Sequence, residues 1–285
     1  MTPEPRLRLV DEMPAVPWSA RLPGETSVAV CIPARNEAAT IGAIVTCLAA
    51  LVRDGVVDEL IVVDDGSTDG TGAIAASAGA RVVRGTDGPG KGQALRQAVT
   101  ATTAEVLVFL DGDVANFSAA YVTELVSALG GDPHLKLVKA AYRRPLHGRP
   151  EEGGRVTELV ARPLLEQFFP EMTGISQPLA GECALTRGLA ERLRFDDGYG
   201  VEIGLLIDTY LAYGRRAIAE VEVVGERVHR NRPLRELTVH ARHVLAAVLA
   251  RTNASLPELT ERHSTAPGGV PPAPASSFRV TESLS

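Results

Sequence analysis

The stretch VLVFLDGDV, residues 106–114, places five apolar residues directly before two aspartates that are separated by one glycine. Because the apolar run is short and rich in β-branched and aromatic residues, it predicts a buried strand over Val106–Leu110. Asp111 and Asp113 then lie at the carboxyl end of that strand, where α/β sheets bind their ligands, and such hard oxygen ligands favour Mg²⁺ or Mn²⁺. A polar turn closed by Gly112 explains the three residues equally well when they are considered alone.

Three further strand patterns precede this one. The apolar runs at 27–33, 59–65 and 80–85 predict strands, and the segments between them repeat apolar residues at helical spacing. A chain that alternates strands and helices in this way predicts an α/β fold, with a mostly parallel sheet flanked by helices. The carboxyl ends of parallel strands meet at one edge, so the loops at that edge are the expected active-site rim.

Beyond residue 114 the alternation is less regular. We expect strands within 135–145, 177–187 and 215–230, a helical segment over 157–172 that Pro163 interrupts, and an apolar helix over 200–214. The helix that begins at residue 233 could pack on the core or on a second subunit, and we expect a homodimer. The chain is predicted to divide into an arm over 1–26, a first lobe over 27–150, a second lobe over 151–232, the helix over 233–263 and a disordered tail over 264–285.

Composition excludes several classes of protein. The formal net charge of −6 argues against a broad nucleic-acid-binding surface. The three cysteines have no CxxC spacing, so we expect neither a disulfide framework nor a zinc site, and a cytoplasmic location fits best. The sequence has no apolar run long enough to span a membrane, and the first residues do not resemble a signal peptide.

Polar loops follow the first two predicted strands. The loop over 33–37 places an amide and a carboxylate where a nucleotide base and ribose could lie, although one of these side chains could equally cap the next helix. The loop over 64–71 has more hydrogen-bond acceptors than a turn needs, and these suit ribose hydroxyls and the polar edge of a base. An N-cap by Ser67, Thr68 or Asp69 is the alternative for the second loop.

A third loop, over 85–91, fits the phosphate-binding spacing G-x-x-x-x-G-K. The residue after it is Gly92, whereas a P-loop has a serine or threonine there to bind Mg²⁺, so the sequence argues against an NTPase. Lys91 lies between two glycines at the start of a predicted helix and could neutralise a diphosphate leaving group. A merely solvated lysine is the alternative.

Three features of the second lobe could carry chemistry. Gly154, Arg155 and Thr157 combine flexible backbone, a guanidinium and a hydroxyl, which suits a carboxylate or phosphate, although the segment could be a basic surface loop. His229 ends a predicted strand and could be structural or a metal ligand. Glu202 lies before an apolar helix, where a carboxylate needs a partner or a function, unless it only stabilises the helix dipole.

Taken together, these pieces resemble the GT-A-fold (Rossmann-like) nucleotide-sugar glycosyltransferases. The general resemblance rests on IPARNEAATI, VVDDGSTDGT and FLDGDV. A closer resemblance, to the retaining glucosyl-3-phosphoglycerate synthases, rests on PGKG, LVKAAYRRPL, GGRVTELVARPLL, QPLAGE, GYGVEIGLLIDT and HRNRPL. It covers about residues 27–252, which makes the first lobe the expected nucleotide-sugar-binding lobe and the second the expected acceptor-binding lobe.

The resemblance implies metal-dependent, retaining transfer of glucose from a nucleotide-diphosphate sugar, UDP-glucose first, to the 2-hydroxyl of 3-phosphoglycerate. It implies Mg²⁺ or Mn²⁺ as cofactor, held by Asp113 and His229, and catalytic roles for Asp113, Lys91 and Glu202. The implied donor-binding residues are Pro33, Ala34, Glu37, Asp65, Lys91 and Asp111. The implied acceptor-binding residues are Gly154, Arg155, Thr157, Tyr199 and Asn231.

The chain also departs from that family. Asp65 and Gly112 stand where serine is common, and the loop HGRPEE before GGRVT is short and charged, which leaves the acceptor open. The alternatives are therefore another donor such as GDP-mannose, another small hydroxy acid as acceptor, or a polyprenyl-phosphate glycosyltransferase. A binding protein with a decayed site would have lost Asp113, Lys91 or His229, and all three are present.

Overall fold

A computed structural model of the chain describes residues 26–85, 90–143, 154–226 and 234–252, which lie in one compact unit. Its centre is a seven-stranded sheet in the order β3-β2-β1-β4-β6-β5-β7. Four of the neighbouring pairs are parallel, and β6 is antiparallel to both of its neighbours, which confirms the mostly parallel sheet. The strands are β1 (Val28–Ala34), β2 (Glu59–Asp64), β3 (Arg81–Arg84), β4 (Val106–Phe109), β5 (Leu137–Arg143), β6 (Cys183–Thr186) and β7 (Ile218–Glu226).

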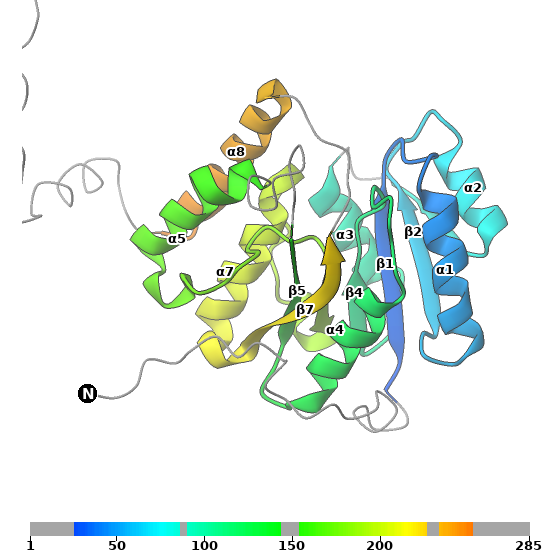
Figure 1. Cartoon of the computed structure of the whole chain (residues 1–285), viewed down its shortest axis with the longest axis horizontal. Helices are drawn as coiled ribbons and strands as arrows, with labels where there is room; N and C mark the ends of the chain where they lie inside the picture. The colour runs from blue at the N-terminus through cyan, green and yellow to red at the C-terminus, as the bar shows by residue number, and fades with distance from the viewer. Residues whose placement is uncertain (1–25, 86–89, 144–153, 227–233, 253–285) are drawn as a thin grey trace, which may run out of the picture. The chain divides into compact units, whose positions relative to one another are not determined.

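Helices pack on both faces of this sheet. Figure 1 shows α1 and α2 beside β1 and β2, whereas α5, α7 and α8 gather toward the other end of the sheet. The helices are α1 (Ile41–Arg53), α2 (Thr71–Ala78), α3 (Lys91–Thr100), α4 (Ala120–Gly131), α5 (Arg162–Phe168), α6 (Arg187–Ala190), α7 (Val201–Tyr213) and α8 (Leu234–Leu249).

The two faces follow from the alternation of side chains along each strand. In β1, Val30 and Ile32 belong to the apolar cluster that includes α1 and α4, whereas Ala29 and Cys31 belong to the cluster that includes α3 and α7. All four residues are fully buried. Because successive strand residues point to opposite faces, a strand covered on both sides must be apolar throughout, as this one is.

The segment after residue 150 does not form a separate sheet. It contributes β6 and β7, and β6 pairs with β4 on one side and β5 on the other. The expected lobes over 27–150 and 151–232 therefore share one sheet and, within the described residues, one compact unit. The predicted arm and tail, over 1–26 and 264–285, fall almost wholly outside the described residues.

The helical segment over 157–172 differs in detail from the expectation. Residues 155–168 are helical without a break: Thr157–Ala161 is a π-helical turn, and α5 continues directly from it, because the Arg162 N–H donates to the Thr157 carbonyl. Pro163 lies inside this segment and has no N–H to donate, so the expected interruption takes the form of a π-helical turn just before the proline. The C-terminal helix ends at Leu249, well inside the expected range of 233–263. Within the described residues, none of the helices has the length and apolar character needed to cross a membrane.

Candidate active site

The loops after β1, β2 and β4 leave the sheet at the same edge. Ala34 at the end of β1 is in register with Asp64 at the end of β2, and Cys31 is in register with Phe109, where β4 ends. The residues that follow these strand ends are the PARNE, DDGSTD and DGD loops. Parallel register thus brings together loops that are about thirty to eighty residues apart in sequence.

Hydrogen bonds join the first two loops. The Asn36 N–H donates to Ser67 Oγ over 3.0 Å, and the Thr68 N–H donates to Asn36 Oδ1 over 2.9 Å. The Glu37 N–H donates to Thr71 Oγ1 over 2.9 Å. The alternative of helix capping by Ser67 or Thr68 is wrong, because both residues bond the neighbouring loop and α2 begins after Gly70 without a side-chain cap.

The donor-site candidates Pro33, Ala34 and Glu37 lie around Gly112, the middle residue of the DGD motif. A Cβ on Gly112 would lie 3.5 Å from the Pro33 carbonyl oxygen and 3.6 Å from side-chain carbons of Ala34 and Glu37. The Thr40 hydroxyl donates to the Gly112 carbonyl over 2.6 Å. A Cβ at these distances would make ordinary van der Waals contacts, so the DGD loop packs against the PARNE loop without requiring glycine at position 112.

Asp65, another donor-site candidate, joins the second loop to the third. Its Oδ2 accepts the Gly90 N–H over 2.9 Å and lies 3.8 Å from the Arg35 guanidinium. Gly90 has a φ of +150°, a conformation that glycine adopts more readily than other residues. The carboxylate thus holds the loop directly before Lys91.

Lys91 lies at the centre of a buried charge cluster. Its Nζ contacts Asp111 Oδ1 and lies 2.5 Å from Glu202 Oε1, and all three side chains are mostly buried. Burial alone would lower the pKa of Lys91, but the two carboxylates outweigh it and raise that pKa well above its usual value. Lys91 is therefore a fixed cation rather than a solvated lysine, and the partner that Glu202 required is this lysine.

Asp111 is held from its other side by the segment before β6. Gly181 approaches the Asp111 carboxylate so closely that a Cβ would overlap it. The preceding Ala180 carbonyl accepts a hydrogen bond of 2.7 Å from Lys139, whose side chain is fully buried on β5 and has its pKa lowered by that burial. Sequence reasoning did not single out Lys139 or Gly181. The only signal was a lysine inside an apolar strand pattern.

The acceptor candidates Gly154, Arg155 and Thr157 lie at the start of the π-helical turn. Gly154 has a φ of +73°, and its carbonyl accepts the Glu158 N–H over 3.0 Å. Thr157 is buried, and its hydroxyl has no hydrogen-bond partner among the described residues. Arg155 is half-buried on the same segment. A π-helical turn is uncommon and frequently marks a functional site, so this segment is a suitable place for a ligand.

Tyr199 lies against the C-terminal helix. Its ring centroid is 3.4 Å from that of His240, and its N–H donates to His243 Nδ1 over 3.3 Å. It follows Gly198 in the short 3₁₀ turn Gly198–Gly200, directly before α7 and Glu202. The structure therefore brings the helix over 233–263 to the rim of the site.

Two predicted ligands, His229 and Asn231, lie outside the described residues. Asp113 is half-buried and directly follows the Asp111–Gly112 pair at the carboxyl edge. Within the described ranges, no three His, Cys, Asp or Glu side chains converge in a way that could bind a metal ion. The assignment of Asp113 as a metal ligand and its pairing with His229 therefore stay predictions.

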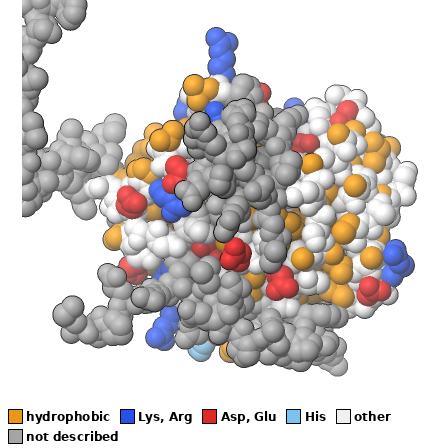
Figure 2. All heavy atoms as spheres, viewed as in Figure 1, with side chains coloured by type: hydrophobic (Ala, Val, Ile, Leu, Met, Phe, Trp, Pro, Cys, Tyr) orange, Lys and Arg blue, Asp and Glu red, His pale blue; other side chains and the backbone are white. Residues whose placement is uncertain are grey.

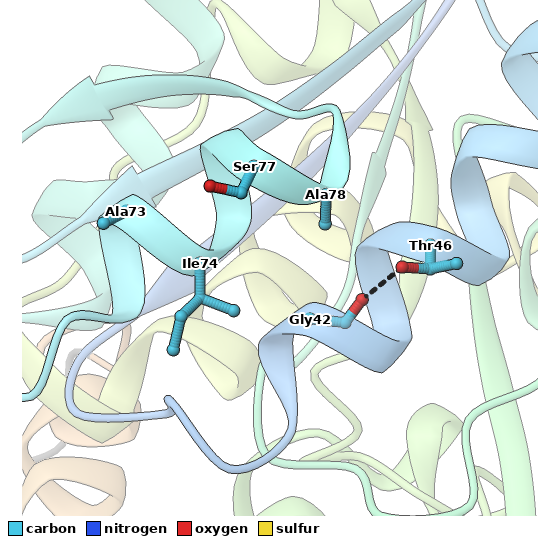
Figure 3. Close-up of a pocket in the computed structure, with 6 residues that line it drawn as sticks. All are labelled: Gly42, Thr46, Ala73, Ile74, Ser77 and Ala78. Carbon is cyan, nitrogen blue, oxygen red and sulfur yellow. Dashed lines mark hydrogen bonds between the residues drawn. The ribbon is translucent and has the colours of Figure 1, made fainter.

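The described surface also has a cavity between two helices beside the first two strands. A shallow cavity of about 450 Å³ lies between α1 and α2, lined by Gly42, Thr46, Ala73, Ile74, Ser77 and Ala78, and contains no ionisable side chain (Figure 3). On the face drawn in Figure 2, the described Lys and Arg side chains are scattered among acidic and uncharged ones. The described side chains on that face form no continuous basic patch of the kind that binds nucleic acid.

The sheet is mostly parallel, paired aspartates follow β4 with a buried lysine beside them, and polar loops follow β1 and β2. Together these features define a glycosyltransferase of the GT-A fold. The model of the family described as "Glycosyl transferase family 2" matches residues 29–158. The glucosyl-3-phosphoglycerate synthase of Mycobacterium tuberculosis is 47% identical over 239 residues, which are 79% of this chain and 73% of that protein. The chain belongs to the family of the glucosyl-3-phosphoglycerate synthases.

Solved structures agree with this membership. A structure of the M. tuberculosis enzyme in complex with Mn²⁺, UDP-glucose and phosphoglyceric acid matches with a TM-score of 0.79 and 43% identity, over 86% of this chain and 87% of that one. A second structure, in complex with Mn²⁺, UDP and glucosyl-3-phosphoglycerate, matches with the same TM-score, the same coverage of both chains and 44% identity. The predicted fold and family are thus confirmed.

Proposed function

We propose that this enzyme transfers glucose from UDP-glucose to the 2-hydroxyl of 3-phosphoglycerate with retention at the anomeric carbon. The observation that carries the proposal is the buried Lys91–Asp111–Glu202 cluster at the carboxyl edge of the sheet. It stands in a chain whose relative is solved with both substrates and, in another structure, with the product.

The residues present fit a divalent metal. Relatives are solved with Mn²⁺ and with Mg²⁺, ions that prefer oxygen ligands, and Asp113 supplies a half-buried carboxylate beside the donor loops. We assign Asp113 and His229 as its ligands in this chain. When bound, the ion supplies positive charge next to the departing diphosphate.

Lys91 supplies the second positive charge. Its pKa is raised by Asp111 and Glu202, so the ammonium is charged throughout the neutral range and can stabilise the leaving diphosphate without any reorganisation. Asp111 and Glu202 fix the position of that ammonium, and we also assign Asp111 as a contact of the ribose or the donor sugar. The diphosphate of the donor would therefore bind beside a positive charge whose position is already fixed.

The same cluster favours a front-face displacement. Glu202 is buried and its carboxylate is paired with Lys91, which makes it a weak nucleophile. The diphosphate oxygen released at the anomeric carbon would then accept the proton of the acceptor hydroxyl on the same face. Glu202 is thus assigned a positioning role in this step.

The acceptor would bind at the start of the π-helical turn and around Tyr199. Arg155 suits a carboxylate or phosphate, the Thr157 hydroxyl has hydrogen-bonding capacity that the described protein does not use, and Gly154 gives the ligand access to backbone. Asn231 completes the assigned set. Arg155→Ala should raise the KM for 3-phosphoglycerate about tenfold or more while UDP binding, measured by calorimetry, changes little.

The test of the function is a donor-by-acceptor panel in which nucleotide release is measured with Mg²⁺, with Mn²⁺ and with chelator. UDP-glucose and 3-phosphoglycerate should give the highest kcat/KM, and Asp113→Ala should remove metal-dependent turnover. A preference for GDP-mannose, for another hydroxy acid or for a polyprenyl phosphate would replace the proposed substrates. Wild-type rates in Asp113→Ala would contradict the metal assignment.

We further propose that the enzyme is a homodimer through α8. This helix exposes Leu234 and Leu245, which lie on the same side of the helix about three turns apart and could pack against the same side of a second copy. Light scattering after size exclusion should give twice the chain mass, and a Leu234→Glu/Leu245→Glu variant should give a monomer. A monomeric wild-type protein at micromolar concentration would contradict the proposal.

A further inference from the structure

Arg251, two residues beyond the end of α8, joins three parts of the fold. Its side chain is only 4% exposed. Its Nε and Nη2 donate to the two carboxylate oxygens of Asp208 on α7, over 2.5 and 2.6 Å. Its Nη2 also lies 2.6 Å from Asp196 Oδ2, in the segment that precedes the Gly198–Gly200 turn. A guanidinium suits this place because it can bind two carboxylates at once without losing its charge.

Gly204 provides the space for this arrangement. It lies within α7, and a Cβ at that position would overlap Asp196 Oδ2 and lie 2.9 Å from Arg251 Nη2. Glycine within a helix costs about 1 kcal/mol relative to alanine. Its presence is explained by the close approach of the ion pair to the helix backbone.

The segment that Arg251 holds lies against the start of α3. Gly92 approaches the Asp196 carbonyl so closely that a Cβ would overlap it, and Gln93 Nε2 donates to Asp197 Oδ1 over 2.9 Å. Lys91 precedes Gly92 in the same helical turn. Contacts therefore run from Arg251 through Asp196 to the turn that carries the lysine.

We propose that Arg251 is a positioning residue for the transfer reaction: through Asp196 it holds the 196–198 segment against Gly92 and so fixes Lys91 between Asp111 and Glu202. The proposal rests on the function assigned to Lys91 above. It also gives the C-terminal helix, which lies outside the residues 29–158 that the family model matches, a part in the active site.

The competing account is that Arg251 merely attaches α8 to the protein. Its Nη1 donates to the Ala247 carbonyl over 2.9 Å, and its bonds to Asp208 tie it to α7. The two accounts differ in the role that they give to each of the carboxylates bound by Arg251, Asp208 and Asp196. The helix that carries Asp208 is already held by buried residues, among them Ile203 and Leu206, whereas Asp196 lies in an irregular segment whose contacts lead to Gly92.

The experiment compares Arg251→Met, Asp196→Asn and Asp208→Asn in the full chain, with kcat, both KM values and Tm measured for each, and with Arg251→Lys as the conservative variant. We expect Arg251→Met and Asp196→Asn each to lower kcat about tenfold to a hundredfold, since a displacement of about 1 Å in an active site has effects of that size. Asp208→Asn should lower Tm but keep kcat within about twofold. The Arg251→Met/Asp196→Asn double variant should be no slower than the worse single variant, because both remove one interaction.

Wild-type kcat in Asp196→Asn, or equal kcat losses in Asp196→Asn and Asp208→Asn, would overturn the proposal. Lys91→Met, assayed alongside, separates it from the proposed function. If Lys91→Met is inactive while Arg251→Met and Asp196→Asn keep wild-type kcat, only the positioning role fails. If Lys91→Met is fully active, the function assigned to that lysine fails first.

Discussion

The loops after β1 and β2 are joined by hydrogen bonds between exposed backbone and short side chains, whereas Lys91 is joined to Asp111 and Glu202 by buried charges. In the first region each bond replaces one that water could make, so a single bond contributes about 1 kcal/mol. In the second, removal of one group leaves the others charged and buried. The loops should therefore tolerate substitution, and the lysine cluster should not.

The cluster also depends on closer packing than the loops. Gly92 and Gly181 each lie where a Cβ would overlap a neighbouring oxygen, of Asp196 and Asp111 respectively. In contrast, Gly66 and Gly70, in the second loop, have open space around them and are glycines because of their positive φ values. Backbone conformation explains the glycines of the loop, and packing explains those of the cluster.

The largest effect is expected for Lys91→Met. It removes the cation that both buried carboxylates contact, so kcat should fall at least about a hundredfold and the free energy of unfolding by about 3 kcal/mol. Chemical denaturation and steady-state kinetics measure the two effects. Lys136→Met is the matched control, because Lys136 lies on the same fold, away from the cluster, and donates to the Pro133 carbonyl. Equal behaviour of the two variants would show that the cluster has no special role.

Gly92→Ala should be the next most damaging change. Alanine is the better helix former, but its Cβ would displace the Asp196 carbonyl, so we expect a loss of about 2 kcal/mol in stability and about tenfold in kcat. The control is Gly188→Ala in α6, where nothing lies within 4 Å of an added Cβ. That control should be neutral or slightly stabilising, and a neutral Gly92→Ala would contradict the packing account.

Glu202→Gln tests the charge of the cluster through pH. The pKa of Lys91 is raised above its ordinary 10.5, so its contribution to stability is fully present below pH 10.5 and is lost as the pH rises through the folded value. The wild-type kcat should show no loss from Lys91 titration at moderately alkaline pH. Removal of the Glu202 charge takes away one of the two carboxylates that raise the pKa of Lys91 against the effect of burial. That pKa should therefore fall, and the alkaline loss of kcat and stability should move to lower pH. An unchanged alkaline limb would contradict this electrostatic account.

The smallest effect is expected at Asn36, in the loop region. Asn36 has a φ of +57°, and its side chain accepts the Thr68 N–H. Asn36→Ala should cost about 1–2 kcal/mol through the backbone conformation and the lost bond, and raise the KM for UDP-glucose only a few-fold. Asn36→Gly, which accepts that φ, should recover part of the stability. A kcat loss as large as that of Lys91→Met would erase the distinction between the two regions.

The fold was predictable because its signals are local. Apolar runs of five to seven residues, covered on both faces, indicated β1, β2 and β4, and the alternation with helices indicated parallel pairing. The π-helical turn before Pro163 was not predictable, because a helix can accommodate a proline in more than one way. The strand within 177–187 was expected, but its place between β4 and β5 was not, since strand order depends on long-range pairing.

Part of the site followed from the same signals. The DGD motif and the PGKG lysine lie at strand and helix ends, so parallel register alone places them at one edge. The partners of Lys91 did not follow, because Glu202 is 111 residues away in sequence and is brought there by the packing of α7. Asp196 and Gly204 had no distinctive pattern of their own, and the only signal for Lys139 was a lysine inside an apolar strand pattern.

The sequence by itself determined which strands form, which loops share an edge and which residue types stand there, because backbone propensity and apolar periodicity act over a few residues. Only the tertiary structure decided that Lys91 is a fixed cation between Asp111 and Glu202, and that Arg251 reaches the same cluster through Asp196. The physical reason is that burial and charge pairing depend on distances between elements that are far apart in the chain.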